Sequence, residues 1–375
     1  MDQSTASPEF TREEVRLALR NPGMPLEALR HPVTPIGMHY LLTHFDIPSI
    51  EAEGYELVVS GLVRHPLRLS LDEIKARPAV TMPVMMECAG NGRAHLSPRA
   101  TSQPWHEEAV GCAEWTGTPL RPLLEEAGLL EDAVEIIFTG HDRGIQEGVE
   151  HDYARSLPLE DALSGDVILA YEMNGQLLPP QHGFPLRAVV PGWYGMASVK
   201  WLKSITAIGE PFEGFQQAVS YRYQNSAEEP GTPVTCKRPR ALMVPPGIPD
   251  FLSRMRYLRT GRTLVEGRAW SGRDPVERIE FSSDGGRTWE EAELGAPPGR
   301  YAWRPWRFEW EVQEPGEYEL CVRATDAAGR TQPTDGDEVW NHGGFGVNVC
   351  QRVAVMVRLQ SPTVHTRNKS VTPDG

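Results

Sequence analysis

Three things are scarce in this sequence: long hydrophobic runs, cysteine and net positive charge. No run of 18 apolar residues is present, so the sequence predicts no transmembrane helix and no membrane partner. The formal net charge of -14 argues against a broad basic face for nucleic acid. The cysteines are odd in number, widely spaced and without a Cys-x-x-Cys pair, which argues against a disulfide framework or a zinc ribbon: Cys88, Cys112, Cys236, Cys321 and Cys350.

Export signals are also missing from the start of the sequence. Met1-Asp2-Gln3-Ser4 opens without a basic segment, an apolar segment or a twin-Arg pair. We therefore expect a cytoplasmic protein, or a periplasmic one if a leader precedes this sequence.

Length and composition allow a large hydrophobic core. With 375 residues, 40% hydrophobic and 23% charged, the chain is typical of a soluble globular protein with two domains. Glycine (35) and proline (33) are abundant, and neither residue fits well inside a helix. The composition therefore favours a loop-rich α+β or β architecture over a helical bundle.

Residues 1–232 carry a mixed pattern of short helices and strands. Capping boxes at Thr11–Glu14 and Ser70–Glu73 each predict a short helix. Residues 117–128 predict a third helix, with proline in its first turn and glycine at its end, and residues 157–164 predict a fourth. Strands are predicted at residues 55–61, 134–139 and 167–171. We therefore expect a mixed α/β domain.

From about residue 230 the sequence changes character. Prolines recur without an apolar period, which predicts a domain linker with its boundary at residues 232 and 233. Beyond it, Trp306, Trp310 and Val312 alternate with charged residues in the period of two that is typical of strands. We predict an Ig-like antiparallel β-sandwich over residues 233–360, followed by a polar tail at residues 361–375.

The segment Met85-Met86-Glu87-Cys88-Ala89-Gly90-Asn91-Gly92-Arg93 carries the strongest signal for chemistry. A cysteine at the end of an apolar run is usually a buried structural thiol. Here, however, Cys88 enters a turn of small residues whose backbone amides can approach a ligand closely. Arg93 adds a positive charge that favours the thiolate, which is a soft ligand that transition metals select. We therefore interpret Cys88 as a metal ligand.

This segment resembles the metal-binding motif of the sulfite oxidase family of molybdenum enzymes, Cys-Ala-Gly-Asn followed by arginine. Further stretches are similar to the family in the same order, and they begin with Trp105 and continue at residues 109–120, 170–175, 182–187 and 191–202. The resemblance covers roughly residues 40–358. It implies a sulfite-oxidase-type molybdopterin-binding domain, followed by a sandwich through which the chain forms a homodimer.

The resemblance implies a molybdenum–pyranopterin (molybdopterin) cofactor whose metal is bound by Cys88. Glycine turns can offer N–H groups to the phosphate of such a cofactor, and basic side chains can supply charge. Taken singly, His182 could be a satisfied surface histidine, and Arg187 and Lys200 could be solvated strand charges. The cofactor-binding residues that the resemblance implies are His44, Cys88, Asn91, His182, Arg187, Gly192, Ser198 and Lys200.

The resemblance also implies a pocket for a small anionic substrate beside the metal. Guanidinium forks suit an oxyanion better than flexible lysines do. The implied reaction is oxidation of sulfite to sulfate by oxo transfer, with electrons passed to an external acceptor, namely a cytochrome, another carrier or dioxygen. The implied catalytic residues are Arg93, Trp105, Tyr221 and Arg352, with Tyr223 as the alternative tyrosine.

One position departs from the family pattern. Tyr40-Leu41-Leu42-Thr43-His44 matches a stretch that normally reads aromatic-x-Arg-Asn-His, so Leu42 replaces an arginine that contacts the anion. Losing one charge-assisted hydrogen bond costs about 1.5–3 kcal/mol, or roughly ten- to a hundredfold in affinity. The alternative substrate is therefore another small oxyanion or an S- or N-oxide.

Two hypotheses from other classes compete with this one. The chain could be a non-catalytic β-sandwich binding protein, although the survival of Cys88, Arg93 and their glycines argues against this. It could also be a metal-free hydrolase with Cys88 as nucleophile and His95 or His106 as base. No nucleophile signature of a known hydrolase family supports that hypothesis.

Overall fold

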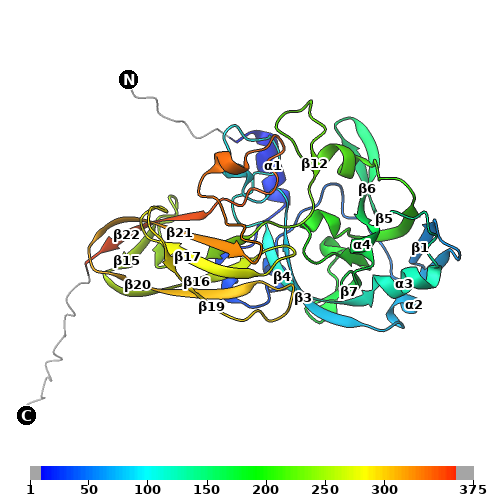
Figure 1. Cartoon of the computed structure of the whole chain (residues 1–375), viewed down its shortest axis with the longest axis horizontal. Coiled ribbons are helices and arrows are strands. Elements are labelled where there is room, and N and C mark those ends of the chain that lie inside the picture. The colour runs from blue at the N-terminus through cyan, green and yellow to red at the C-terminus, as the bar shows by residue number, and fades with distance from the viewer. Residues whose placement is uncertain (1–9, 360–375) are drawn as a thin grey trace, which may run out of the picture.

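The structure, a computed structural model, describes residues 10–359, and Figure 1 shows two lobes side by side. One lobe is mixed α/β and is built from the first part of the chain, and the other is a β-sandwich. The predicted polar tail, residues 361–375, lies outside the described residues. Among the described helices, none is long and apolar enough to cross a membrane.

Apolar strands build two sheets in the first lobe. In the first sheet β1 and β10 run parallel and the other neighbours are antiparallel, in the order β2 (Leu67–Ser70), β1 (Glu56–Gly61), β10 (Leu202–Ile208), β5 (Glu135–Gln146) and β6 (Val149–Pro158). The second sheet is antiparallel. Its strands are β3 (Val80–Glu87), β4 (Val110–Pro119), β7 (Ile168–Met173) and β8 (Gln176–Leu177), with β9 (Arg187–Val189) paired to β7.

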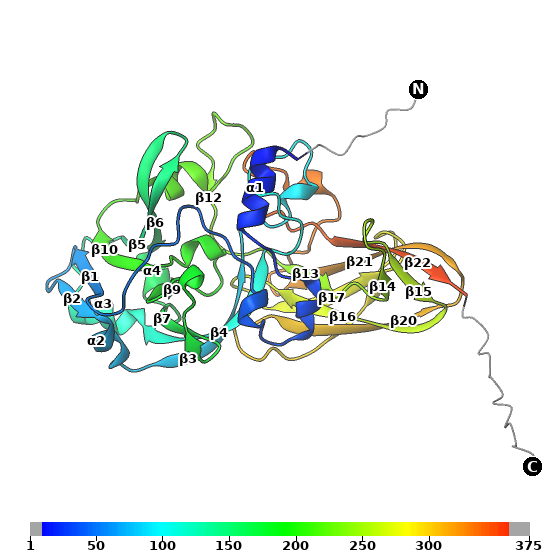
Figure 2. The same ribbon diagram turned by 180° about the vertical axis from the view of Figure 1, so that it is seen from behind.

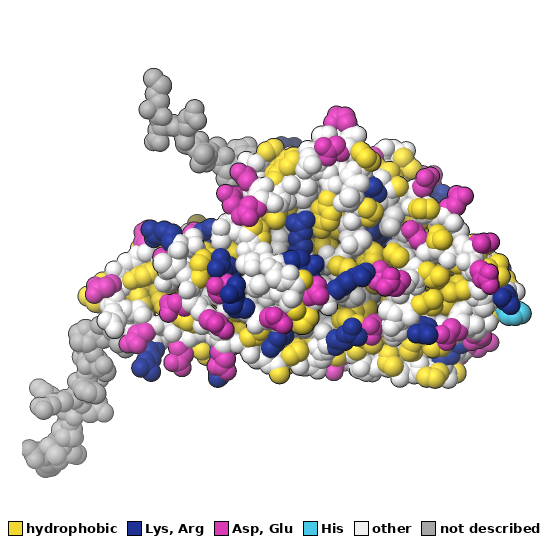
Figure 3. All heavy atoms as spheres, viewed as in Figure 1, with side chains coloured by type: hydrophobic (Ala, Val, Ile, Leu, Met, Phe, Trp, Pro, Cys, Tyr) yellow, Lys and Arg dark blue, Asp and Glu magenta, His cyan; other side chains and the backbone are white. Residues whose placement is uncertain are grey.

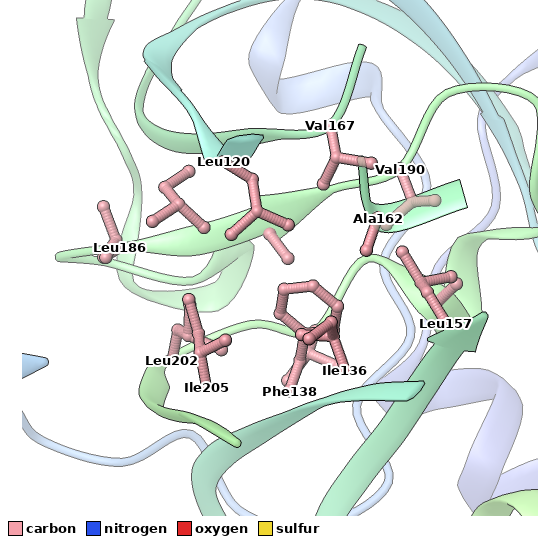
Figure 4. Packing of buried hydrophobic residues seen from close by; sticks show 14 of the residues in the cluster. Leu120, Ile136, Phe138, Leu157, Ala162, Val167, Leu186, Val190, Leu202 and Ile205 are labelled. Carbon is pink, nitrogen blue, oxygen red and sulfur yellow. The ribbon is translucent and has the colours of Figure 1, made fainter. Parts of the chain in front are cut away.

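An apolar core fills the space between these two sheets. Figure 4 shows Leu120, Phe138 and Ile205 pointing toward one another from different elements, and all three are fully buried. Burying one large apolar side chain stabilises a fold by about 1.5–3 kcal/mol. The core therefore holds the second sheet firmly against the first, and Cys88 directly follows β3 of that second sheet.

The two predicted capping boxes are present. At α1 (Arg12–Arg20) the Thr11 hydroxyl accepts from the Glu14 backbone while the Glu14 carboxylate accepts from the Thr11 backbone. Ser70 and Glu73 form the same reciprocal pair at α2 (Leu71–Lys75). Local sequence therefore decides where both helices begin.

The other two predicted helices are shorter than expected. α3 (Leu120–Ala127) ends at Gly128, which has a φ of 68°, but it begins three residues later than predicted. The reason is that residues 117–119 still pair with β7 as part of β4. α4 spans Leu159–Ala162.

The second lobe is a sandwich of two sheets. In β20 the residues Trp306, Trp310 and Val312 are buried while the charged residues between them are exposed, as the alternation predicted. One detail differs from a purely antiparallel sandwich, because β15 and β22 run parallel. The first sheet contains β13 (Arg240–Met243), β16 (Gly261–Trp270), β20 (Arg304–Val312) and β19 (Glu293–Leu294). The second contains β14 (Ile248–Pro249), β15 (Arg256–Arg259), β22 (Gln351–Arg358), β21 (Gly316–Asp326), β17 (Val276–Ser282) and β18 (Glu290–Glu291).

The two lobes are joined at more than one point. The predicted boundary at residues 232 and 233 falls within β12 (Thr232–Pro233), which pairs with β11 (Arg222–Tyr223) before the chain enters the sandwich. The N-terminal segment after α1 runs across the face of both lobes that Figure 2 shows, and Arg268 and Trp303 of the sandwich donate to its backbone carbonyls at 2.8 Å each. Spatially this segment therefore belongs to the interface between the lobes.

The surface carries charges of both signs. Figure 3 shows Lys and Arg interspersed with Asp and Glu over one face, without a broad basic area on that face. This agrees with the formal net charge of -14.

Candidate functional site

Cys88 lies at the point where β3 ends and a tight turn begins. Its backbone N–H donates to the Ala109 carbonyl at 2.9 Å, which continues the pairing with β4 for one residue. Its carbonyl accepts from the Asn91 N–H at 3.0 Å, and Gly92 closes the turn with a φ of 91°. Only 6% of Cys88 is exposed, so a rigid strand presents its thiol to an enclosed space.

The residue before the cysteine anchors this strand end. The Glu87 carboxylate is buried and accepts from Arg240 at 3.0 Å, from Asn91 at 3.1 Å and from the Trp270 indole at 2.8 Å. A buried charge with three charge-assisted partners is held in one position. Because Arg240 and Trp270 come from the sandwich, the second lobe helps to set the place of the Cys88 turn.

Burial and nearby polar groups have opposite effects on the pKa of the Cys88 thiol. Burial raises its pKa, and this outweighs the opposing effects of the Arg93 guanidinium, the Gly90 N–H and the Trp105 indole. Arg93 thus acts in the predicted direction, but by itself it does not bring the pKa below the ordinary value. Coordination to a metal ion deprotonates such a thiol directly.

Arg93 and Cys88 line the same cavity, of about 270 Å³, which we call the Arg93 cavity. The guanidinium donates to the carbonyls of Gln103 at 2.9 Å and Gly343 at 3.1 Å, and it lies over the Phe345 ring. A Cβ at Gly90 would lie 2.6 Å from Nη2 of Arg93, so a larger residue here would displace the guanidinium from its place. Further residues lining the cavity include Leu42, Thr43, His44, Gln103, Trp105, Tyr221 and Phe345.

Two aromatic side chains complete this cavity. The indole N–H of Trp105 is buried and lies beside the Cys88 thiol, whose pKa it lowers. The Tyr221 hydroxyl hydrogen-bonds with Nε2 of His44 at 2.8 Å, and burial raises the pKa of this tyrosine. Tyr223 packs under Arg238 instead and does not line the cavity. Of the two predicted tyrosines, Tyr221 is therefore the one that lines the Arg93 cavity.

A second cleft meets the first at Cys88, and we call it the Lys200 cleft. It shares Leu42, His44 and Tyr221 with the Arg93 cavity. Of the residues expected to bind the cofactor, the structure brings His44, Cys88, His182, Arg187, Ser198 and Lys200 to this cleft. It also contains His39, Tyr40, Asp142 and Tyr153.

The basic groups of the Lys200 cleft are buried and held by backbone carbonyls. Arg187 donates to His182 and Ser198 at 2.9 Å each, and burial lowers its pKa to about 10. Lys200 donates to the Leu42 carbonyl at 2.7 Å, and burial with the nearby Arg187 lowers its pKa to about 7. Carbonyl partners do not neutralise these cations, so the cleft is suited to an anionic group such as a phosphate.

Two polar residues of the cleft were not predicted from the sequence. Nε2 of His39 and Oδ1 of Asp142 are buried and have no hydrogen-bond partner among the described residues. Burial lowers the pKa of His39 to about 4 and raises that of Asp142 to about 7. No sequence pattern marks either residue; in the structure, Asp142 lies where the pairing of β5 with β6 is irregular, between Thr139 and Arg143.

Three predicted residues lie outside the cavity and the cleft, which corrects the prediction. The Asn91 side chain binds the Glu87 carboxylate and the Ala109 N–H, so it shapes the turn instead of facing a ligand. Gly192 lines a separate cavity between the lobes. Arg352, on β22, donates to Glu319 across the sheet and to the Gly285 and Thr334 carbonyls, because the register of the sandwich directs it there.

The residues of the site suit a molybdenum–pyranopterin group. The thiolate of Cys88 is a soft metal ligand, and Arg187 and Lys200 supply charge for a phosphate. A pterin ring offers N–H donors and ring acceptors, and the unpaired atoms of Asp142 and His39 match such groups. Burying an unpaired polar atom costs free energy, and a hydrogen bond from a polar ligand would offset that cost.

The catalytic bases of the hydrolase hypothesis do not reach the thiol. Neither His95 nor His106 lines the Arg93 cavity or the Lys200 cleft with Cys88. His95 is paired with Glu107 at 2.7 Å instead.

Comparison with known proteins finds a matching family for each lobe. Residues 44–216 match the family described as "Oxidoreductase molybdopterin binding domain", and residues 252–358 match the "Mo-co oxidoreductase dimerisation domain". The chain is similar to the sulfite oxidase of Gallus gallus, with 35% identity over 343 residues that cover 83% of this chain and 70% of that protein. It is also 30% identical to the NADH nitrate reductase of Solanum lycopersicum over 368 residues, covering 89% of this chain and 40% of that protein.

Among solved structures, the sulfane dehydrogenase SoxCD from Paracoccus pantotrophus has a similar fold. The TM-score is 0.77, the sequence identity is 23%, and the match covers 96% of both chains. The two-lobed arrangement is therefore shared over nearly the whole chain.

Proposed function

Because this chain belongs to the sulfite oxidase family of molybdenum oxidoreductases, we propose that it oxidises sulfite to sulfate and passes the electrons to an external acceptor. It is an enzyme of that family, and its cofactor is molybdenum–pyranopterin.

The observation that carries the proposal is the shared position of Cys88 and Arg93. Both side chains line one small cavity, and two backbone carbonyls hold the guanidinium in place. A fixed fork beside a metal-bound thiolate is suited to a small oxyanion. A substrate as small as sulfite can therefore be bound next to the metal.

The chain's own residues have clear tasks in this reaction. Arg93 binds and orients the anion, and the buried indole N–H of Trp105 lies beside the Cys88 thiol. Tyr221 is held by His44 at 2.8 Å and keeps its proton, because burial raises its pKa. Phe345 and Leu42 give the cavity an apolar lining beside these polar groups. The cofactor, when bound, supplies the two-electron redox chemistry.

A second candidate function follows from Leu42. Arg93 is the one arginine among the residues that line the Arg93 cavity, whereas two guanidinium groups would hold a dianion more tightly. A singly charged oxyanion or a neutral S- or N-oxide needs less positive charge. The relationship to a nitrate reductase gives this candidate additional support.

The decisive experiment combines metal analysis with a substrate screen. The purified protein is expected to contain one molybdenum and one pterin, and sulfite is expected to bleach its thiolate-to-molybdenum absorption. The second candidate would be favoured, and sulfite rejected, if sulfite caused no bleaching while nitrate, or an S- or N-oxide, restored the absorption of the chemically reduced protein.

Cys88→Ser tests the assigned metal ligand. We expect a folded protein that retains pterin but has lost the absorption band and the oxidase activity, because a hard hydroxyl replaces thiolate poorly. Cys236→Ser is the matched control, since Cys236 does not line the Arg93 cavity or the Lys200 cleft. Retained turnover in Cys88→Ser would overturn the role of this residue.

Assembly and location remain proposals. We propose a homodimer formed through the sandwich lobe, with support from the match to a dimerisation domain at residues 252–358. The electron acceptor is a cytochrome, another carrier or dioxygen. The cytoplasmic location expected from the sequence stays a prediction.

A further inference from the structure

Two histidines and one glutamate gather at the surface near the Cys88 turn. The ligand atoms of His95, His106 and Glu107 all lie within 4.8 Å of one another. We propose that these three residues form a binding site for a divalent transition metal, distinct from the molybdenum site. None of them lines the Arg93 cavity or the Lys200 cleft.

The backbone holds the three side chains together. His95 ends the 3-10 helix η3 (Arg93–His95), while His106 and Glu107 precede β4. The two segments are joined by the hydrogen bond from the Ala94 N–H to the Trp105 carbonyl at 2.9 Å. This bond lies next to the candidate ligands on both segments, so their approach follows from the fold and does not depend on the side chains alone.

The distances suit a metal of zinc size. Nε2 of His95 and Oε1 of Glu107 are 2.7 Å apart, and the rings of His95 and His106 have centroids 5.2 Å apart. Ligand atoms around a tetrahedral Zn²⁺ stand about 3.3 Å from one another, given bonds of about 2.0–2.1 Å. Small side-chain rotations therefore bring all three atoms into the first coordination sphere, and water completes it.

The donor set selects the class of metal. Two imidazoles and a carboxylate suit Zn²⁺, Cu²⁺ or Ni²⁺ better than Mg²⁺ or Ca²⁺, which prefer oxygen ligands. Both histidines are exposed to an arriving ion, and the Glu107 carboxylate lies beside them.

Such an ion would connect the two segments that carry the anion-binding groups. Arg93 lies two residues before His95, and Trp105 directly precedes His106. A metal bridge between these segments would restrict the movement of both groups in the Arg93 cavity. Metal binding is therefore expected to stabilise the region against thermal unfolding.

The test is a metal titration of the untagged molybdenum-containing enzyme after removal of loosely bound ions. One equivalent of Co²⁺ is expected to bind with micromolar affinity and to give visible d–d absorption, which Zn²⁺ then displaces. His95→Ala and His106→Ala are each expected to weaken binding at least tenfold while the molybdenum content is unchanged. His65→Ala, at an exposed histidine elsewhere, is the control and is expected to bind as the wild type does.

Two results would overturn the proposal. One is an absence of stoichiometric Co²⁺ or Zn²⁺ uptake by the wild type, which would leave His95 and Glu107 as a hydrogen-bonded pair without a metal. The other is equal affinity in the wild type and both alanine variants, which would place the bound ion elsewhere.

Discussion

Replacement of Leu42 by arginine tests how the anion is held. Leu42 lines both the Arg93 cavity and the Lys200 cleft, and its backbone carbonyl is fixed by Lys200 at 2.7 Å. A side chain at this position therefore starts from an anchored backbone and reaches a cavity of about 270 Å³ beside Cys88. Leu42→Arg would add a second guanidinium to that cavity.

The expected gain follows from one added charge-assisted hydrogen bond. Such a bond contributes about 1.5–3 kcal/mol, which corresponds to roughly a ten- to hundredfold change in affinity. Repulsion between the new guanidinium and Arg93 offsets part of this gain. We therefore expect sulfite KM and the sulfate dissociation constant to fall roughly tenfold, toward the lower end of the range.

Calorimetric titration with sulfate measures this change without turnover, and steady-state kinetics with sulfite give the KM. Leu42→Met is the matched control, because it changes the shape of the side chain but adds no charge. If Leu42→Arg binds sulfate no more tightly than Leu42→Met does, with the molybdenum content intact, the Arg93 cavity is not an anion site of the kind described.

Further substitutions test the anchors around the site. Arg240→Leu is expected to lower the free energy of unfolding by about 3–5 kcal/mol in urea denaturation, because it leaves the Glu87 carboxylate buried without its cation. The control is Arg262→Leu at an exposed ion pair, which should lower the free energy of unfolding by less than about 1 kcal/mol. Equal effects of the two substitutions would contradict the anchoring role of Arg240. Arg93→Lys is expected to raise the KM for sulfite at least tenfold, since lysine cannot reproduce the guanidinium group that binds two backbone carbonyls. An unchanged KM would exclude a contact between Arg93 and the anion. In the cofactor-free protein, His39 has a pKa of about 4, below its ordinary value of 6.5. Between pH 6.5 and pH 4 the unfolded state therefore binds more protons than the folded state. As a consequence, the free energy of unfolding falls as the pH is lowered through this range. The loss is up to about 1.4 kcal/mol per pH unit, and urea denaturation at pH 7 and pH 5 should show a smaller loss in His39→Gln than in the wild type.

Local features of the fold could be predicted because neighbouring residues decide them. The capping boxes at Thr11 and Ser70 lie within one helical turn, so the sequence alone predicts where α1 and α2 begin. The period of two in β20 reflects which side of one strand is buried. The turn after Cys88 is likewise local, since Gly90 and Gly92 permit the close approach and the positive φ that it needs.

Arg187 and Lys200 were expected from the resemblance to bind the cofactor, and both line the Lys200 cleft. Only the tertiary structure decided which distant groups join them there. His39 and Asp142 are brought to the Lys200 cleft from separate segments, and no short-range pattern marks them. Arg352 was placed in the pocket by resemblance, but the pairing of β21 with β22 directs it to Glu319.

The Cys88 turn also depends partly on local sequence and partly on tertiary packing. Its sequence predicts a soft metal ligand, because thiolate chemistry and glycine conformations are properties of the residues. Its position depends on Arg240 and Trp270 from the other lobe, which bind Glu87 across more than 150 residues of chain. Local geometry is set by bonds and dihedral angles within a few residues, but the distance between remote side chains is set by how sheets and cores pack.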